Sequence, residues 1–312
     1  MITRAITFLS AIAVLWCTVN PFYLLSQEEG VSSLDLGING YGLSFGNSKR
    51  FNGVRINFRD HNVSELNGLN ITLWKAGGSP GGSINGIALG IVGPEADRVR
   101  GFGFGLLGVG AESQLSGIMI GGLGAGSGGN IDGFAAGLLG AGAGGNISGI
   151  VLGGLGGGCG GNFSGIGIGG LGAGAGGNVS GTLVGLLGAG AGGSLKGFAL
   201  GGLGAGAGGN VSGIVIGGLG AGAGGRLTGI GFGLLGVGAT ELHGLGFGAY
   251  VRTQSAKAIC LSGYNRSETY NGISIALFNS TKFLKGIQLG AINYAGNNPG
   301  IFKVLPLVNV HL

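Results

Sequence analysis

Charged residues are scarce in this sequence. They make up 9% of the chain, against about 25% in an ordinary soluble domain, and between 101 and 240 only Glu112, Asp132, Lys196 and Arg226 carry charge. A nucleic-acid-binding protein needs a dense basic stripe that displaces counterions, so the net charge of +5 does not indicate a nucleic-acid partner. No two titratable side chains are placed to share a proton. The sequence therefore predicts no enzyme, no catalytic, cofactor-binding or metal-binding residues, and no small-molecule substrate.

Proline and cysteine are scarce as well, with 5 and 3 residues. Low proline and the lack of a Gly-X-Y triplet exclude collagen, and a hydrophobic share of 44% excludes a polar linker. Cys17 lies in the N-terminal segment, which leaves two cysteines, too few for a disulfide framework. We expect Cys159 to be a small packed residue and Cys260 to lie at an outward position with an exposed thiol.

The N-terminal segment has the outline of an export signal. Arg4 precedes an apolar run from Ile6 to Leu25, and the acidic pair Glu28 and Glu29 follows. This pattern predicts a signal peptide over residues 1–26 or, because the run is long enough to span a bilayer, a retained membrane anchor. Both alternatives predict an exported protein.

Glycine supplies 82 of the 312 residues and recurs at a fixed period. Counted from the glycine after each N-h-S, where h is apolar, the unit reads G-h-x-h-G-[GL]-L-G-A-G-A-G-G-N-h-S over sixteen residues. We expect regular repeats over 101–240, flanked by degenerate repeats that act as caps over 27–100 and 241–312. Five asparagines mark the period, with Ser194 and Arg226 in the same register: Asn130, Asn146, Asn162, Asn178 and Asn210.

The repeat excludes helix and favours strand. Each glycine costs about 1 kcal/mol relative to alanine inside a helix, and a unit contains seven or eight of them. Positions 2 and 4 are apolar while position 3 varies, which predicts a short strand with positions 2 and 4 inward and position 3 outward. We therefore expect an all-β fold, a β-solenoid in which one sixteen-residue unit forms one coil. The five asparagines then form a structural ladder along the coils.

An antiparallel transmembrane β-barrel is the alternative. The repeat length, the low charge and a mean hydropathy of +0.52 fit one strand per unit. However, the units show no two-unit rhythm, which alternating turns on opposite sides of a membrane would produce, and neither face of the strands is polar. The solenoid is the better interpretation.

Three motifs match known sites by chance in a glycine-rich chain. The stretch GAGSGG at 124–129 fits a dinucleotide fingerprint, but no helix can follow it. GLSFG around Ser44 fits a nucleophile elbow without supporting acid and histidine partners. Asp132 is the only aspartate at the place where a calcium-binding β-roll needs one in every turn.

The units at the C-terminal end, NGISIALFNSTKFLKGIQLGAINYAGNNPGIFKVLPLVNVHL, are similar to those of bacterial exported surface-repeat proteins of the spirochaete type, whose units read like GVQIGLVN. The resemblance covers about residues 37–312 and is carried best by GIQLGAIN and LPLVNVHL. This chain departs from the pattern over 101–240, where glycine replaces the usual asparagine after the strand. The resemblance implies an exported, envelope-associated protein without assigned catalysis, and it supplies no site residues.

These observations lead to one functional expectation. We expect a non-enzymatic structural or interaction protein of the cell envelope or surface, which self-associates or contacts an envelope or membrane through flat, uncharged faces of Gly, Ala and Ile. An outer-membrane pore or anchor is the alternative if the fold is a barrel.

Overall fold

A computed structural model describes residues 33–78 and 81–312. The predicted segment 1–26 lies outside the described residues. The chain divides into two compact units, the first ending at Glu112 and the second running from Ser113 to Leu312. No helical segment among the described residues is long and apolar enough to cross a membrane.

The first unit stacks strands of similar length. Strand β1 pairs with β2 in an antiparallel hairpin, and β2 to β6 then pair in parallel, each with the next. The hairpin turn is Asn39 and Gly40, both with positive φ, as a two-residue hairpin turn requires. The strands are β1 Ser33–Ile38, β2 Tyr41–Gly46, β3 Arg50–Asn57, β4 Glu65–Thr72, β5 Ser83–Gly90 and β6 Glu95–Gly105, followed by β7 Gly108–Gly121.

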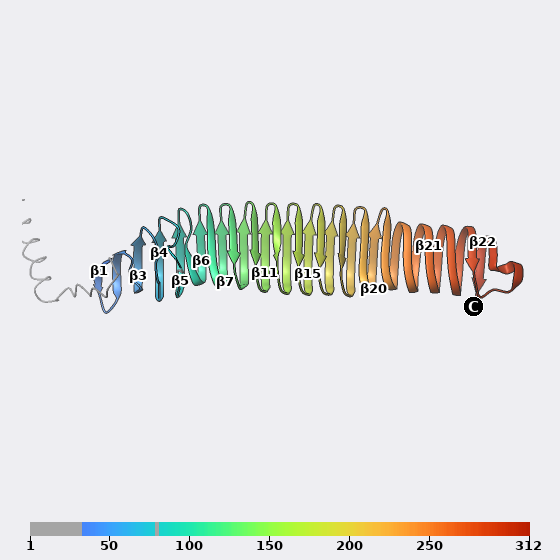
Figure 1. Cartoon of the computed structure of the whole chain (residues 1–312), viewed down its shortest axis with the longest axis horizontal. Helices are drawn as coiled ribbons and strands as arrows, with labels where there is room; N and C mark the ends of the chain where they lie inside the picture. Colours follow the sequence, from blue (N-terminus) through green and yellow to red (C-terminus); the bar gives the residue numbers. More distant parts are fainter. Residues whose placement is uncertain (1–32, 79–80) are drawn as a thin grey trace, which may run out of the picture. The chain divides into compact units, whose positions relative to one another are not determined.

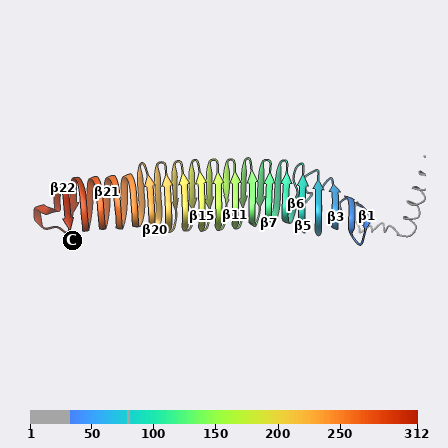
Figure 2. The ribbon, with the colours of Figure 1, turned by 180° about the vertical axis from the view of Figure 1, so that it is seen from behind.

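The second unit builds each coil from a longer and a shorter strand, and the coils stack in parallel (Figures 1 and 2). The longer strands are β9 Asn130–Gly137, β11 Ile147–Gly153, β13 Phe163–Gly169, β15 Val179–Gly185, β17 Leu195–Gly201 and β19 Val211–Gly217. The shorter strands are β8 Gly124–Ser127, β10 Gly140–Ala143, β12 Gly156–Cys159, β14 Gly172–Ala175, β16 Gly188–Ala191 and β18 Gly204–Ala207. Both runs continue through β20 Gly220–Gly233 and β21 Gly236–Ala295.

The pairing confirms the predicted fold. Residues sixteen apart face each other across neighbouring coils, for example Ile147 and Phe163, and the result is a β-solenoid of about 12 turns. The antiparallel transmembrane β-barrel is wrong, because neighbouring repeats run in the same direction and hydrogen-bond in parallel register.

The coil spacing shortens toward the C-terminal end. Gly229 pairs with Gly244 fifteen residues later. After that the spacing is fourteen: the backbone of Ala258 lies against Gly272, where a Cβ would meet its carbonyl oxygen, and the backbone of Gly272 lies against Gly286 in the same way. Ala258 stands where the other coils have glycine. A 3-10 turn, η1 Gly300–Lys303, leads into β22 Val304–His311, which pairs antiparallel with the end of β21.

The predicted facing of the longer strand is wrong. Val151 and Leu183 at position 3 are fully buried, whereas Ile150 at position 2 is 39% exposed. The strict alternation of a strand places positions 1, 3 and 5 inward, and two of these are glycine. The interior therefore holds the side chain at position 3 and the larger apolar residue two positions before position 1, such as Phe163 at 1% exposure, opposite small residues such as Ala141. The apolar residue at position 2 is left outside.

The first glycine of each coil is required by the backbone. Gly165 has φ +130°, a conformation that L residues rarely adopt, and a Cβ there would lie 1.9 Å from the carbonyl oxygen of Gly149 in the preceding coil. The sixteen-residue recurrence of glycine at this position therefore reflects the close stacking of coils.

Candidate functional site

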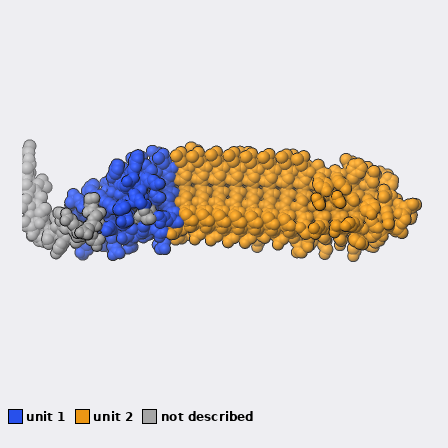
Figure 3. Space-filling model, in the orientation of Figure 1, with its two compact units in different colours: residues 1–112 blue, residues 113–312 orange. Residues whose placement is uncertain are grey.

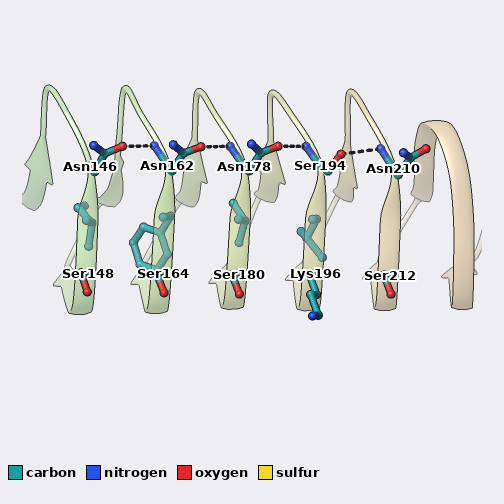
Figure 4. Close-up of a pocket in the computed structure, with 14 residues that line it drawn as sticks. Asn146, Ser148, Asn162, Ser164, Asn178, Ser180, Ser194, Lys196, Asn210 and Ser212 are labelled. Carbon is teal, nitrogen blue, oxygen red and sulfur yellow. Dashed lines mark hydrogen bonds between the residues drawn. The ribbon is translucent and has the colours of Figure 1, made fainter.

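The predicted asparagine ladder occupies the corner that precedes each longer strand (Figure 4). The Oδ1 atom of Asn146 accepts a hydrogen bond of 2.8 Å from the backbone N–H of Asn162, and Asn162 does the same for Asn178. Asn130 begins the row by accepting from the backbone N–H of Asn146. Each side chain thus satisfies a backbone donor of the next coil, at a turn where the main chain alone leaves it unpaired.

Ser194 continues the row and Arg226 ends it. The hydroxyl of Ser194 accepts from the backbone N–H of Asn210 at 3.1 Å, so the shorter side chain still bridges the coils. Asn210 in turn accepts from the backbone N–H of Arg226. The guanidinium of Arg226 donates to Glu241 at 2.6 Å instead of continuing the row.

A row of serines runs beside the asparagines and forms a shallow groove with them (Figure 4). The groove has a volume of about 640 Å³. Its serine row consists of Ser148, Ser164, Ser180 and Ser212, with Lys196 in the place of one serine. Among the described residues these serine hydroxyls have no hydrogen-bond partner. The groove can exchange hydrogen bonds with solvent, but Lys196 is its only ionisable group.

Apolar rows cover the rest of the outer face of the longer strands. Position 2 leaves Ile118, Ile150, Ile166 and Ile214 between 37% and 48% exposed. The corner that follows adds leucines at position 7, such as Leu155 at 50%. Figure 3 shows the second unit as regular rows of atoms that repeat from coil to coil. The rows arise because strand alternation places position 2 on the face opposite positions 1, 3 and 5, and the sequence interpretation missed them by placing position 2 inside.

The outer face of the shorter strands is made of glycine. In the alternating GAGA segments the alanines point inward, as Ala173 and Ala189 do at 5% exposure, and the glycines between them point outward. A shallow hollow lies over these strands between Gly174 and Gly208. This face offers backbone only and has no side chain that could hold a cofactor.

The described residues hold buried polar clusters whose members bond one another. In the first unit, Arg55 is 1% exposed and donates to Asp60 at 2.5 Å, to Asn70 at 2.7 Å and to Asn47 at 2.9 Å. Asp60 also accepts from the hydroxyl of Thr72. The charge of Arg55 is paired and sealed from solvent, so this cluster is structural.

The candidate nucleophiles from the sequence lie in structural surroundings. Ser44 is in β2, and its hydroxyl donates to Asp35 at 2.6 Å with no histidine in the cluster. Cys260 is fully buried, so its predicted exposure is wrong. Burial raises the pKa of Cys260 to about 11 and raises the pKa of its neighbour Tyr270, and both groups stay protonated at neutral pH. Cys159 is half-buried and its thiol lies 3.3 Å from the carbonyl of Asn162.

The other motif matches also lie on ordinary coils. The stretch 124–129 forms β8 and a bend before the next strand, β9. Asp132 accepts a hydrogen bond from Gln114 at 2.7 Å. No group of three or more His, Cys, Asp or Glu side chains that could hold a metal ion occurs within the described ranges.

Comparison with protein-family models, with curated proteins and with solved structures found no match.

Proposed function

We propose that this chain is a non-enzymatic, exported structural or interaction protein of the cell envelope or surface, which binds there through the apolar outer face of its coils. The observation that carries the proposal is the set of exposed isoleucines and leucines on the longer strands and at the corner that follows them.

The extent of this face supports the proposal. Eleven coil steps separate Gly117 from Gly286, which at about 4.8 Å each gives a length of about 50 Å. The span from position 2 to the corner is about 15 Å, so the face measures roughly 750 Å². The largest apolar patch of a typical monomer is about 300–600 Å², and larger ones mark interaction sites.

The distribution of charge supports it further. Between 133 and 235 the charged residues are Lys196 and Arg226, and both lie on the groove side of the coil. A partner can therefore cover the apolar rows without removing a charge from water, which would be costly. Export is supported by the outline of the N-terminal segment alone.

A matched pair of variants tests the face. Ile166→Glu with Ile214→Glu places charge in the apolar row, and Ser164→Glu with Ser212→Glu places the same charge two residues earlier on the same strands. We expect the wild-type chain and the serine variant to sediment with isolated envelopes and the isoleucine variant to stay in the supernatant. If the wild-type chain does not sediment, or both variants sediment equally, the proposal is wrong.

Export is tested separately. The full chain is expressed in a bacterium, the cells are fractionated, and the N-terminal sequence of the recovered protein is determined. We expect recovery with the envelope or surface fraction. Recovery of the intact chain in the cytosol would contradict the localisation.

A further inference from the structure

From Leu138 to Leu234, the corner at position 6 holds a protruding leucine, here called a leucine knob, in every third coil and a glycine in the two coils between. Leu138, Leu186 and Leu234 stand there with 70%, 72% and 62% of their surface exposed. The coils between them have glycine at this corner: Gly154, Gly170, Gly202 and Gly218. The protruding leucines therefore recur every 48 residues, or every three coils.

The leucine and glycine corners differ in which residue of the preceding coil accepts a hydrogen bond from the backbone N–H at position 6. The N–H of Gly154 donates to Gly137 at 3.0 Å, a residue at position 5 of the preceding coil, and Gly218 bonds to Gly201 in the same way. The N–H of Leu138 bonds instead to Gly122, which is at position 6.

The glycine corners have no room for a side chain. A Cβ would lie 1.7 Å from a backbone oxygen of the preceding coil at Gly154 and at Gly218, and 1.8 to 1.9 Å at Gly170 and Gly202. The leucine knobs and the gaps between them are thus set by the backbone and not by mobile side chains.

The knobs rise beside a continuous, rigid apolar row. The leucines at position 7 follow one another in every coil from Leu139 to Leu235, each 45% to 64% exposed. Their backbones are tied by hydrogen bonds between coils, for example from Leu171 to Leu155 at 2.7 Å. A partner that fits this corner needs gaps for the knobs at a spacing of three coils, about 14 Å.

We infer that this corner binds a second copy of the chain. Two copies aligned in parallel with an offset of one coil place five of their six leucine knobs against glycine corners of the partner. The sixth, Leu234 of one copy, lies against the small Ala249, which stands at position 6 of the next coil. A lipid surface has no three-coil period, and an unrelated protein has it only by coincidence. This inference rests on the proposed function, because it names the partner for part of the same apolar face.

The available area fits a dimer of moderate affinity. A contact that extends from this corner across the whole apolar face covers roughly 750 Å² by the dimensions given above, close to the roughly 800 Å² that each partner buries in a standard interface. Neither Lys196 nor Arg226 lies at this corner, since both occur after the shorter strand of their coils. Close contact at the knobs therefore leaves no buried unpaired charge.

The test is the concentration dependence of molar mass of the full chain, measured by light scattering after size exclusion. The variant combines Leu138→Ser, Leu186→Ser and Leu234→Ser, and the control combines Leu→Met at the same three positions, which keeps apolar knobs. Because the three side chains are mostly exposed, both variants should match the wild-type circular dichroism and urea midpoint. We expect a wild-type dimer, a serine variant whose dissociation constant is at least about tenfold higher, and a methionine variant within about threefold of wild type.

Two results would overturn the inference: a wild-type chain that stays monomeric at every concentration, or a serine variant that dimerises as well as the wild type. Envelope sedimentation of the same samples separates this failure from that of the proposed function. A monomeric chain that still sediments with envelopes, or that floats with phosphatidylglycerol vesicles, rejects the second copy and keeps the envelope role. Loss of both dimer and envelope binding in the wild type rejects both.

Discussion

Two regions of the second unit form the same β-solenoid with different interior side chains. They are the regular coils, which begin at Gly117, and the C-terminal coils from Gly244 to Ala295. In the regular coils position 3 is apolar or glycine, as Val151 and Leu183 show, and the spacing is sixteen residues. In the C-terminal coils the same inward position holds Ser274 and Gln288, both fully buried, and the spacing is fourteen. The interior changes from apolar to polar within one unit.

The hydrogen bonds at the corner after the longer strand explain this difference. In the regular coils the polar groups of the corner bond to the backbone of the neighbouring coil, since the N–H of Leu155 donates to the carbonyl of Leu139. In the shorter coils Asn279 and Asn293 point inward, and the Nδ2 of Asn279 donates to the carbonyl of Leu289 at 3.1 Å and to Asn293 at 2.7 Å. A coil that loses two residues thus replaces backbone bonds with side-chain amides.

The largest expected effect tests how strictly the regular coils need glycine. Gly165→Ala should lower the free energy of unfolding by more than about 3 kcal/mol, because it combines an unfavourable φ with a contact of 1.9 Å to a backbone oxygen. Gly238→Ala is the matched control, since a Cβ there meets nothing within 4 Å, and it should change stability by less than about 1 kcal/mol. Urea unfolding followed by circular dichroism measures both, and equal losses would show that stacking does not select glycine.

The two asparagine rows should differ in their contribution to stability. Asn279→Ala removes a buried amide, so the hydroxyl of Ser274 loses its acceptor and the Oδ1 of Asn293 loses a donor, which should cost about 2–3 kcal/mol. Asn162→Ala removes one bond at an exposed corner where water can replace it, which should cost about 1 kcal/mol or less.

Asn162→Ser should cost less still, because Ser194 already makes the same bond. The urea midpoints of these variants measure how much each asparagine row contributes to stability. A loss of stability in Asn162→Ala as large as that in Asn279→Ala would contradict the comparison.

The thiols of the two described cysteines should differ in reactivity, because one lies in the regular coils and the other in the C-terminal coils. Cys260 is inside the polar coils with a pKa of about 11, whereas Cys159 is half-buried in a regular coil. Iodoacetamide at pH 8 should label Cys159 much faster than Cys260, as measured by mass spectrometry of the peptides. Equal rates in the native protein would show that the C-terminal coils open.

Ionisation of the Cys260 thiol should make the free energy of unfolding depend on pH. Its folded pKa lies above the ordinary value of 9.0, so its contribution to stability is complete below pH 9 and is lost as the pH rises toward 11. The free energy of unfolding should fall by roughly 1 kcal/mol between pH 8 and pH 10, and less in Cys260→Ala.

Much of the fold could be predicted from the sequence because the period is strict. Glycine content excluded helix, alternation indicated strands, and the sixteen-residue register of Asn146 and Asn162 predicted their stacking. The facing of Ile150 could not be predicted in this way, because alternation gives two faces and the usual rule that apolar residues lie inside selects the wrong one. In these coils the variable position 3 is inside, together with the apolar residue two positions before position 1.

The candidate site was predictable to a smaller extent. The asparagine row was expected, but its bonds run from side chain to backbone. Bonds from amide to amide occur in the first unit, where Asn67 donates to Asn52 at 2.7 Å. The leucine knobs recur visibly in the sequence at position 6, yet only the structure distinguishes the exposed Leu186 from the closed backbone at Gly202.

The sequence by itself determined the repeat, the strand content and the stacking of one unit on the next, because a fixed period of glycine and asparagine permits few other structures. The tertiary structure decided which face is inside, where the polar interior begins and which corners protrude. These depend on the width of the closed coil and on distances between backbones, and neither quantity is written in the order of residues along one strand.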